Sequence, residues 1–221
     1  PLPGDTRLPM RYIDLMGGNK PHLLVKTINN LGAETRIRYV SSTQFYLADK
    51  AAGKPWITKL PFPVHVVERV ETYDLISRNR FVTRYAYHHG YFDGVEREFR
   101  GFGMVEQWDT EDAYAGTVTT ATAAAEDTNW DAASLVPPAL TRTWFHTGAF
   151  LQEGRISKQF EQEYYREGDP GNGEGELTPD QLEAILLPDT VLPVDLTVEE
   201  TREAYRSLKG AILRQEIYAL D

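Results

Sequence analysis

The sequence predicts a mainly β protein, an antiparallel meander of hairpins with two short α-helices near the C-terminus. Three observations lead to this fold class. Several runs of the chain alternate between two kinds of side chain, with the period of two that a β-strand requires. Short turn sequences separate these runs without an intervening helix, which favours antiparallel neighbours over βαβ units. The two explicit helix-start signals both lie after residue 175.

Length and composition are those of a globular protein. The chain has 221 residues, of which 41% are hydrophobic and 25% charged, which is enough for a sizeable core. It contains no apolar run of about 18 residues and no signal peptide, so the sequence predicts no membrane insertion. Because it begins with Pro1 rather than Met, we expect it to be a fragment of a longer protein. The absence of cysteine excludes disulfides, thiolate metal sites and a cysteine nucleophile.

The charge is divided unevenly along the chain. Residues 1–108 carry 15 basic and 11 acidic residues, whereas residues 109–221 carry 8 and 22. The acidic second half disfavours a nucleic-acid face, and the basic residues of the first half are scattered along strands rather than gathered in a run. We therefore expect no nucleic-acid partner.

The pattern of turns divides the chain into three predicted segments. These are an irregular N-terminal segment at 1–21, an antiparallel β region at 22–125 and a mixed β region at 126–221. In the β region, Asp93-Gly94 is the strongest turn signal, because Asp-Gly favours tight hairpin turns. Residues 49–56 are predicted to form a loop. The predicted strands of this region are 22–28, 34–40, 60–73, 80–90, 95–110 and 116–125.

The second half mixes several kinds of structure. A strand is predicted at 140–150, whereas 155–168 is ambiguous between strand and helix. Residues 168–176 form a predicted acidic, glycine-rich loop. These segments precede the two predicted helices.

Both C-terminal helices have capping boxes, in which the first and fourth residues satisfy each other's backbone N–H groups. The motif that begins at Thr178 predicts a helix near 179–187, and Pro188 ends it. The motif that begins at Thr197 predicts a helix near 198–209, after which the chain returns to a strand.

The densest group of chemistry-bearing side chains is the stretch YAYHHGYFDGVEREFRGFG, from Tyr85 to Gly103. Adjacent residues of a strand point to opposite faces, so His88 and His89 are not expected to bind one metal together. A zinc site needs three or four ligands at a recognisable spacing, and the chain has no H-x-x-x-H or H-E-x-x-H motif. We interpret both histidines as side chains that finish a strand and satisfy polar groups at a turn.

The carboxylates of this stretch indicate ion pairing rather than catalysis. Glu96 and Glu98 share one strand face with Arg100, as in cross-strand charge pairs on an exposed face. A glycosidase instead needs two carboxylates that face each other across a cleft. Gly101 and Gly103 are expected at a bulge or a close backbone approach. The chain has no phosphate-binding loop and no G-x-S-x-G motif.

His146 lies beside Trp144 and Phe145 and is interpreted as a packed side chain. The chain is therefore predicted not to be an enzyme, with no catalytic, cofactor-binding or metal-binding residue and no cofactor. Two alternatives stay open. One is a metal-dependent hydrolase built on His88, His89, Asp93 and Glu96. The other is a carbohydrate-binding or cell-surface-binding module with an aromatic surface drawn from Tyr39, Tyr85, Tyr87, Tyr91, Phe99, Phe102 and Trp108.

Four strings carry a family resemblance that runs from about residue 20 to residue 221. They are FYLADKAAGKPWITKLPFPVHVVERVETYD, RYAYHHGYFDGVEREFRGFGMVEQWDTE, TRTWFHTGAF and EAYRSLKGAILRQEIYALD. In this order they resemble the middle region of the B component of bacterial Tc insecticidal toxin complexes, a region also found in SpvB-like virulence proteins. The resemblance departs at His88-His89, where the family more often has His-Asp.

The resemblance implies an architectural role. In that family the B component and its C-type partner wind long β-sheets, related to Rhs and YD-repeat proteins, into a hollow shell around a cytotoxic effector. The family's enzymatic parts lie in other regions, and none of their residues maps onto this chain. The implied partners are the rest of a longer chain, a C-type component with its enclosed effector and, through other regions, an A-type pore-forming component. The implied location is a secreted bacterial toxin complex.

Overall fold

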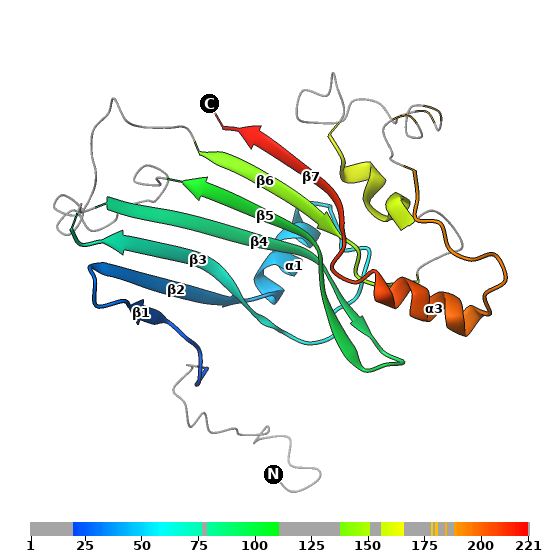
Figure 1. The fold of residues 1–221 in the computed structure, drawn as a ribbon, viewed down its shortest axis with the longest axis horizontal. Coiled ribbons are helices and arrows are strands. Elements are labelled where there is room, and N and C mark those ends of the chain that lie inside the picture. The colour runs from blue at the N-terminus through cyan, green and yellow to red at the C-terminus, as the bar shows by residue number, and fades with distance from the viewer. Residues whose placement is uncertain are drawn as a thin grey trace, which may run out of the picture.

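Seven β-strands pair in the order in which they occur along the chain (Figure 1). The computed structural model describes residues 20–76, 79–110, 138–150, 156–165, 178, 180, 184 and 188–220. Every pair of neighbouring strands is antiparallel, which confirms the predicted mainly β, antiparallel meander. The strands are β1 (Lys26–Ile28), β2 (Ala33–Ser41), β3 (His65–Asp74), β4 (Asn79–Asp93), β5 (Glu98–Thr110), β6 (Ala139–Phe145) and β7 (Ile212–Ala219).

The sheet draws strands from both predicted β regions. β1 to β5 come from the range 22–125, and β6 and β7 come from the range 126–221. The division of the chain at these boundaries stays a prediction. Most of the range 1–21, the predicted strand at 116–125 and the acidic loop at 168–176 lie outside the described residues.

The hairpin of β4 and β5 turns at the predicted Asp-Gly pair. The Asp93 carboxylate accepts hydrogen bonds from the backbone N–H of Val95 at 2.9 Å and of Glu96 at 3.1 Å. An aspartate that bonds to the backbone a few residues ahead is a common turn former. Pairing resumes at Glu98 rather than at Val95, where the strand was predicted to begin, because these bonds keep the intervening residues in the turn.

The two faces of the sheet differ in chemistry. Residues that pair directly across neighbouring strands lie on the same face, and alternate residues lie on the opposite face. One row across β4 to β7 consists of Ala86, Glu106, Arg142 and Glu216. The next row, on the other face, consists of Tyr85, Gln107, Thr141 and Ile217. The sheet therefore has a charged face and a face made mainly of uncharged side chains.

Ion pairs and cation–π contacts cross the charged face from β1 to β7. The Tyr73 ring lies under two guanidinium groups, with Arg36 at 4.7 Å and Arg80 at 5.4 Å from its centroid. Such partly exposed pairs each stabilise the fold little, but together they fix the register of the strands. The pairs along this face are Lys26–Glu34, Arg36–Glu34, Arg69–Glu71, Arg80–Glu71, Arg142–Glu106 and Arg214–Glu216.

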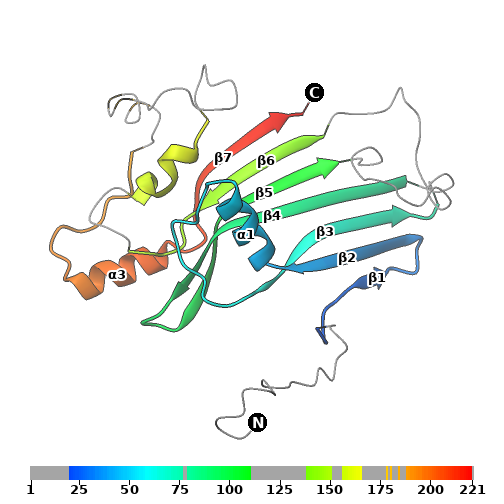
Figure 2. The ribbon, with the colours of Figure 1, turned by 180° about the vertical axis from the view of Figure 1, so that it is seen from behind.

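A helix between β2 and β3 is a correction to the sequence analysis, which placed helices only near the C-terminus. The helix α1 (Thr43–Ala51) lies behind the sheet in Figure 1 and in front of it in Figure 2. It has no side-chain cap, and nine residues are too few for an isolated helix. Long-range contacts hold its start instead, since the Ser42 N–H donates to the Val64 carbonyl and the Ser42 hydroxyl accepts from the Val64 N–H.

Two further helical segments lie beside the ends of β6 and β7 (Figure 1). The helix α3 (Val198–Ser207) begins at the predicted capping box, in which Thr197 and Glu200 bond to each other's backbone N–H groups. Residues Ile156–Glu163 form the 3-10 segment η2, which is kinked at Phe160, so this part of the ambiguous range 155–168 is helical. None of the described helices is long and apolar enough to span a membrane.

The other predicted helix, near 179–187, lies largely outside the described residues. Asp180 and Ala184 are its described members, and both are helical. The capping box at Thr178 stays a prediction.

The substitution Thr197→Ala should lower the free energy of unfolding by about 1 kcal/mol, because it removes the side chain that caps α3. Urea unfolding of the 221-residue chain, followed by circular dichroism, measures the change. Thr201→Ala is the matched control, since the Thr201 hydroxyl only bonds back to the Thr197 carbonyl within the same helix. We expect less than about 0.5 kcal/mol for the control. Equal losses in the two variants would contradict the capping role.

Candidate functional site

The stretch from Tyr85 to Gly103 lies where β4 extends beyond its neighbour β3. The two strands pair only as far as Arg84. Beyond that point the loop after α1 replaces β3, since the Thr58 hydroxyl donates to the Gly90 carbonyl and the Phe92 N–H donates to the Lys59 carbonyl. This half of β4 is therefore a junction between the sheet and the elements packed against it (Figure 2).

His88 is held between two carboxylates. Its Nδ1 lies 2.6 Å from Asp49 Oδ2 on α1, and its Nε2 lies 3.5 Å from Glu106 Oε2 on β5. Burial alone would lower the pKa of His88, but the hydrogen bonds with Glu106 and Asp49 outweigh it and raise the pKa. The Trp56 indole N–H also donates to Asp49, and Glu106 pairs with Arg142 at 2.8 Å. Contacts through His88 therefore connect α1, β4, β5 and β6.

His89 makes a second, separate set of contacts. Its Nε2 lies 2.6 Å from Glu163 Oε1 on η2, while its Nδ1 accepts a hydrogen bond from the Ile57 backbone N–H at 3.2 Å. The other Glu163 oxygen accepts from the Trp144 indole N–H at 2.9 Å. Burial would raise the pKa of Glu163, but the hydrogen bonds from His89 and Trp144 keep the pKa below its usual value.

We call His88, His89, Asp49, Glu106 and Glu163 the histidine junction. The backbone of His89 has a φ of 55°, a left-handed value that is uncommon outside glycine and asparagine. The strand does not end at these histidines, as the sequence analysis expected, but continues to Asp93 because it stays paired with β5 as far as Glu98. The two imidazoles bind different carboxylates, so the expectation that they do not converge is confirmed.

The four residues of the hydrolase alternative are not brought together. Asp93 is paired with Arg100, and Glu96 lies 3.9 Å from Arg206 on α3, away from the histidine junction. Among the described residues, no group of three or more His, Asp or Glu side chains is placed to hold a metal ion.

Arg100 is a second attachment point, and its burial is a correction to the predicted exposed charge pairing. Its Nη2 lies 2.9 Å from Asp93 Oδ2, its Nη1 donates to the Gly148 carbonyl at 2.6 Å, and both charged residues are 5% exposed. Burial would raise the pKa of Asp93, but the backbone N–H groups of the turn and the Arg100 charge lower it. The pair ties the hairpin tip to the loop that follows β6.

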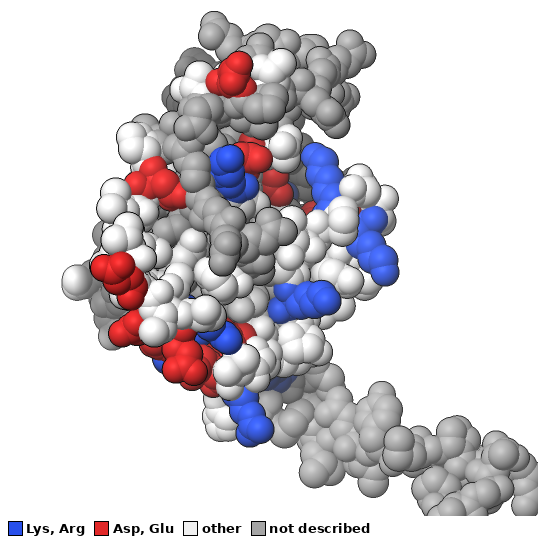
Figure 3. Space-filling model, turned by 90° about the vertical axis from the view of Figure 1, so that its right-hand side faces the viewer, with Lys and Arg blue, Asp and Glu red and all other residues white. Residues whose placement is uncertain are grey.

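The hairpin tip also holds α3. Glu98 lies 2.9 Å from Lys209 and 3.5 Å from Arg206, so it forms ion pairs in the structure. Hydrogen bonding and charge from Lys209 lower the pKa of Glu98. Figure 3 views the end of the molecule where α3 lies, and acidic side chains gather on one part of that surface.

The two glycines of β5 have the predicted roles. Gly101 has a φ of 92° at an irregularity in the β4–β5 register. A Cβ built on Gly103 would overlap the ring tip of Phe160 and lie 3.0 Å from the His89 Cβ. Phe160 belongs to a small apolar cluster under η2, together with Met104, Trp144 and Tyr164. Gly103 therefore allows η2 to approach the sheet closely.

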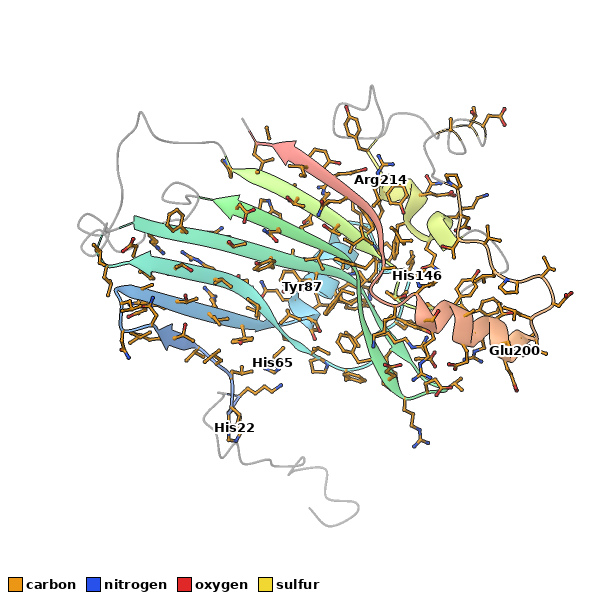
Figure 4. The ribbon with its side chains drawn as sticks, viewed as in Figure 1. His22, His65, Tyr87, His146, Glu200 and Arg214 are labelled. Carbon is orange, nitrogen blue, oxygen red and sulfur yellow. The ribbon has the colours of Figure 1, made fainter. Side chains whose placement is uncertain are left out.

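His146 is packed, as predicted, and lies where α3 meets the sheet (Figure 4). It is 1% exposed, its ring is 5.7 Å from that of Tyr205, and its Nδ1 accepts a hydrogen bond from the Gly148 N–H at 2.8 Å. Burial lowers the pKa of His146 to about 4. The imidazole is therefore neutral at physiological pH.

Several aromatics of the carbohydrate-binding alternative are used in packing. The rings of Tyr87 and Phe102 are 5.0 Å apart, and Trp56 and Phe45 contact this pair from the side of α1. Burial raises the pKa of Tyr87 to about 12. Tyr85 is half-buried on the uncharged face, so a glycan surface at these residues stays a prediction.

The substitution Gly103→Ala should lower the free energy of unfolding by about 1–3 kcal/mol, because the added methyl group overpacks the contact with Phe160. Gly94→Ala is the matched control, since no atom lies within 4 Å of its Cβ position. Thermal and urea unfolding measure both variants. A Gly103 variant as stable as the Gly94 variant would contradict the close approach of η2.

Acid should destabilise the fold through His146. Above about pH 6.5 the side chain is neutral in both states, and below it the unfolded chain gains a proton that the folded chain does not bind. The stability is therefore present above the unfolded pKa and falls by at most about 1.4 kcal/mol per pH unit towards the folded pKa of about 4.

Urea unfolding at several pH values checks this slope. His146→Asn keeps an acceptor for the Gly148 N–H but cannot titrate, so the variant should lose less stability in acid than the parent chain. His65→Asn is the control, because His65 is exposed. This variant should lose as much unfolding free energy per pH unit in acid as the parent chain. Identical slopes for the parent and His146→Asn would show the expectation to be wrong.

Comparisons with known proteins agree with the resemblance of the sequence. Residues 12–131 match the family described as the insecticide toxin TcdB middle/N-terminal region. The crystal structure of TcdB2-TccC3-TEV is similar at 34% identity, with a TM-score of 0.64, over 90% of this chain and 8% of that chain. The structure of the Photorhabdus luminescens Tc holotoxin pore is similar at 35% identity, with a TM-score of 0.64, over the same shares. No curated protein matches the chain.

A third structure, of TcdB2-TccC3, is 32% identical over 89% of this chain, with a TM-score of 0.62. The chain spans only 8% of the length of the chains it matches in these structures. The family match covers more than half of the 221 residues, and the structural matches cover nearly all of them. The chain therefore belongs to the family of the TcdB middle/N-terminal region, found in the B component of insecticidal Tc toxins.

Proposed function

We propose that the chain is a non-catalytic wall segment of a toxin-complex B component, which helps to form a β-shell around a cytotoxic effector before translocation. The observation that carries the proposal is the 34% identity, over 90% of the chain, to part of a chain in the TcdB2-TccC3-TEV structure. The family match indicates no catalytic family. Binding of the A-type pore-forming component would fall to other regions of the longer protein.

The dimensions of the sheet support a wall. β4 has 15 residues and β5 has 13, so the central hairpin extends for about 45–50 Å at the usual rise of a strand. Among the described strands, β1 and β7 each pair on one side only. Sheet edges are normally paired or covered, so we expect other segments of a longer chain to continue the sheet.

The two faces support separate tasks for the two sides of the wall. On the charged face, acids and bases are largely paired with each other. The other face offers threonine, tyrosine, glutamine and aliphatic side chains. An enclosed polypeptide would meet either surface through many weak contacts, so no single residue should dominate its retention.

The polar side chains that could take part in catalysis make contacts between elements of the fold. His88, His89 and Arg100 each contact a partner on another element, at distances typical of charge-assisted hydrogen bonds. We propose that the native protein is part of a secreted toxin complex whose partners are the rest of its own chain and a C-type component with its effector.

The proposal is tested on the native gene product and its C-type partner. We expect an intact mass far above 25.1 kDa, the mass of this chain, and a stable complex after co-expression. In that complex the C-terminal part of the C-type component should resist a protease that degrades it when it is produced alone. A native product of about the mass of this chain would overturn the proposal, as would an effector that stays equally sensitive in the complex.

A pair of glycine variants tests the contribution of this segment to the barrier. In the full-length protein, Gly103→Ala should make the effector more sensitive to protease, because it displaces η2 from the sheet. Gly94→Ala should leave the protection unchanged, since its added methyl group meets no neighbour. The same protection in both variants, despite a measured loss of stability in the first, would argue against a role in the wall.

A further inference from the structure

The outer surface of α1 is uncovered in the structure. None of its nine residues is buried, and Figure 2 shows the helix in front of the sheet with no described helix or strand over it. Phe45 and Asp49 make the inner contacts, since Phe45 lies 5.8 Å from a tyrosine ring of β4 and Asp49 binds His88. On the outer side, Tyr46 is 40% exposed and Leu47 is 57% exposed.

The outer side of α1 is continuous with an aromatic side chain of the loop that follows it. The Tyr46 ring packs edge-on against the Trp56 ring, with 5.4 Å between their centroids. Leu47 and the exposed Ala51 are one helical turn apart, so they lie side by side on the helix. We call Tyr46, Leu47, Ala51 and Trp56 the α1 patch. An exposed apolar surface on a folded protein commonly marks a contact with another polypeptide segment.

Contacts beneath the α1 patch hold it in one arrangement. The Trp56 indole N–H donates to Asp49 at 2.6 Å, and the same carboxylate lies 2.6 Å from His88 Nδ1. The Trp56 ring also packs against an aromatic ring of β5, with 6.1 Å between the centroids. At the start of the helix, Ser42 and Val64 exchange two hydrogen bonds. A preformed surface of this kind loses little conformational entropy when another segment covers it.

The charge around the α1 patch is positive, although the whole chain carries a net charge of −10. Residues 43–60 contain three lysines and one acid, Asp49, which is used in the inner contacts. Lys50 lies one helical turn from Tyr46, Lys54 follows the helix, and both lysines are exposed. Within the described part of the chain, no carboxylate pairs with either ammonium group. The surface therefore suits a segment that combines apolar and acidic side chains.

The shortness of α1 favours a permanent cover. A helix of nine residues without a side-chain cap is marginal unless its faces are packed, so a cover present in every folded molecule suits it better than a transient partner. This chain spans 8% of the chain that it matches in the TcdB2-TccC3-TEV structure. We propose that the α1 patch docks an acidic, apolar segment of the longer polypeptide, from outside residues 1–221. The inference rests on the proposed function, in which this chain is one part of a longer B component.

Zero-length cross-linking of the full-length gene product, without its C-type partner, identifies what covers the patch. A carbodiimide joins lysine and carboxylate groups that are in contact, and mass spectrometry identifies both peptides. We expect Lys50 or Lys54 to be joined to Asp or Glu outside residues 1–221. The pair of Lys209 and Glu98, 2.9 Å apart, is the internal control for the reaction.

The source of each cross-link is read from a mixture of isotopically light and heavy protein. A segment of the same polypeptide gives links in which both peptides carry the same isotope. Links only between light and heavy copies would overturn the proposal, as would links that form only after the C-type component is added. The absence of any link from Lys50 and Lys54, while the control pair reacts, would also overturn it.

Hydroxyl-radical oxidation measures whether Leu47 is covered in the full-length product. Its rate in the native protein is compared with its rate in the unfolded protein at the same radical dose. A side chain that is 57% exposed should react within about threefold of the unfolded rate. A docked segment excludes water, so we expect the native rate to be lower by about tenfold or more. A native rate within threefold would overturn the proposal.

Charge reversal tests whether the docked segment is acidic. Lys50→Glu and Lys54→Glu, made separately, should each raise the oxidation of Leu47 by about threefold or more, because the new carboxylate repels the segment. Lys54 lies outside the helix, so its variant does not disturb the end of α1. Lys158→Glu is the matched control, since Lys158 is an exposed lysine on η2, and it should leave Leu47 unchanged. Oxidation equal to that of the parent in both test variants would overturn the proposal.

This inference and the proposed wall function fail in different experiments. The protease test of the wall follows the effector of the C-type component, whereas cross-linking and oxidation follow α1. A Leu47 that reacts freely in a complex that still protects its effector would overturn the docking surface alone. A native product of about 25.1 kDa would overturn both, and its mass would show this before any cross-linking.

Discussion

The elements outside the sheet depend on charged groups buried along one half of the β4–β5 hairpin. α1 is attached through His88 and η2 through His89, while the loop after β6 is attached through Arg100. Among the described residues, the apolar cluster that supports η2 has four buried members, so these polar contacts help to determine where the elements lie. Removing one partner of a buried pair commonly costs about 3–5 kcal/mol, because the remaining charge is left without compensation. The arrangement thus gives positional specificity more than net stability.

Local backbone geometry makes this concentration of contacts possible. β3 leaves β4 after Arg84 and thereby frees an edge that the loop after α1 occupies. The left-handed conformation of His89 and the irregular register at Gly101 turn the hairpin away from a regular ladder. At Gly103 the absence of a side chain lets Phe160 approach. Bulges and positive φ values next to one another are typical of places where a sheet re-aims side chains.

Signals between residues close in sequence predicted much of this structure. Alternating strands, the Asp93 turn and the cap at Thr197 are local, and the structure shows all three. α1 was not predicted because the Ser42 side chain bonds to Val64, 22 residues away, rather than capping its own helix. The burial of Arg100 was not predicted for the same reason, since the Gly148 carbonyl that it binds lies 48 residues further along the chain. The partners of the histidines come from 39 and 74 residues away, beyond what a pattern can indicate.

Backbone bonds and side-chain contacts hold different parts of this structure together. The ladders of the seven strands are bonds between amide groups, which do not titrate. The attachments of α1, η2 and the loop at 52–64 instead pass through the imidazole and carboxylate side chains of the histidine junction. The sheet and the elements attached to it are therefore held by different kinds of contact.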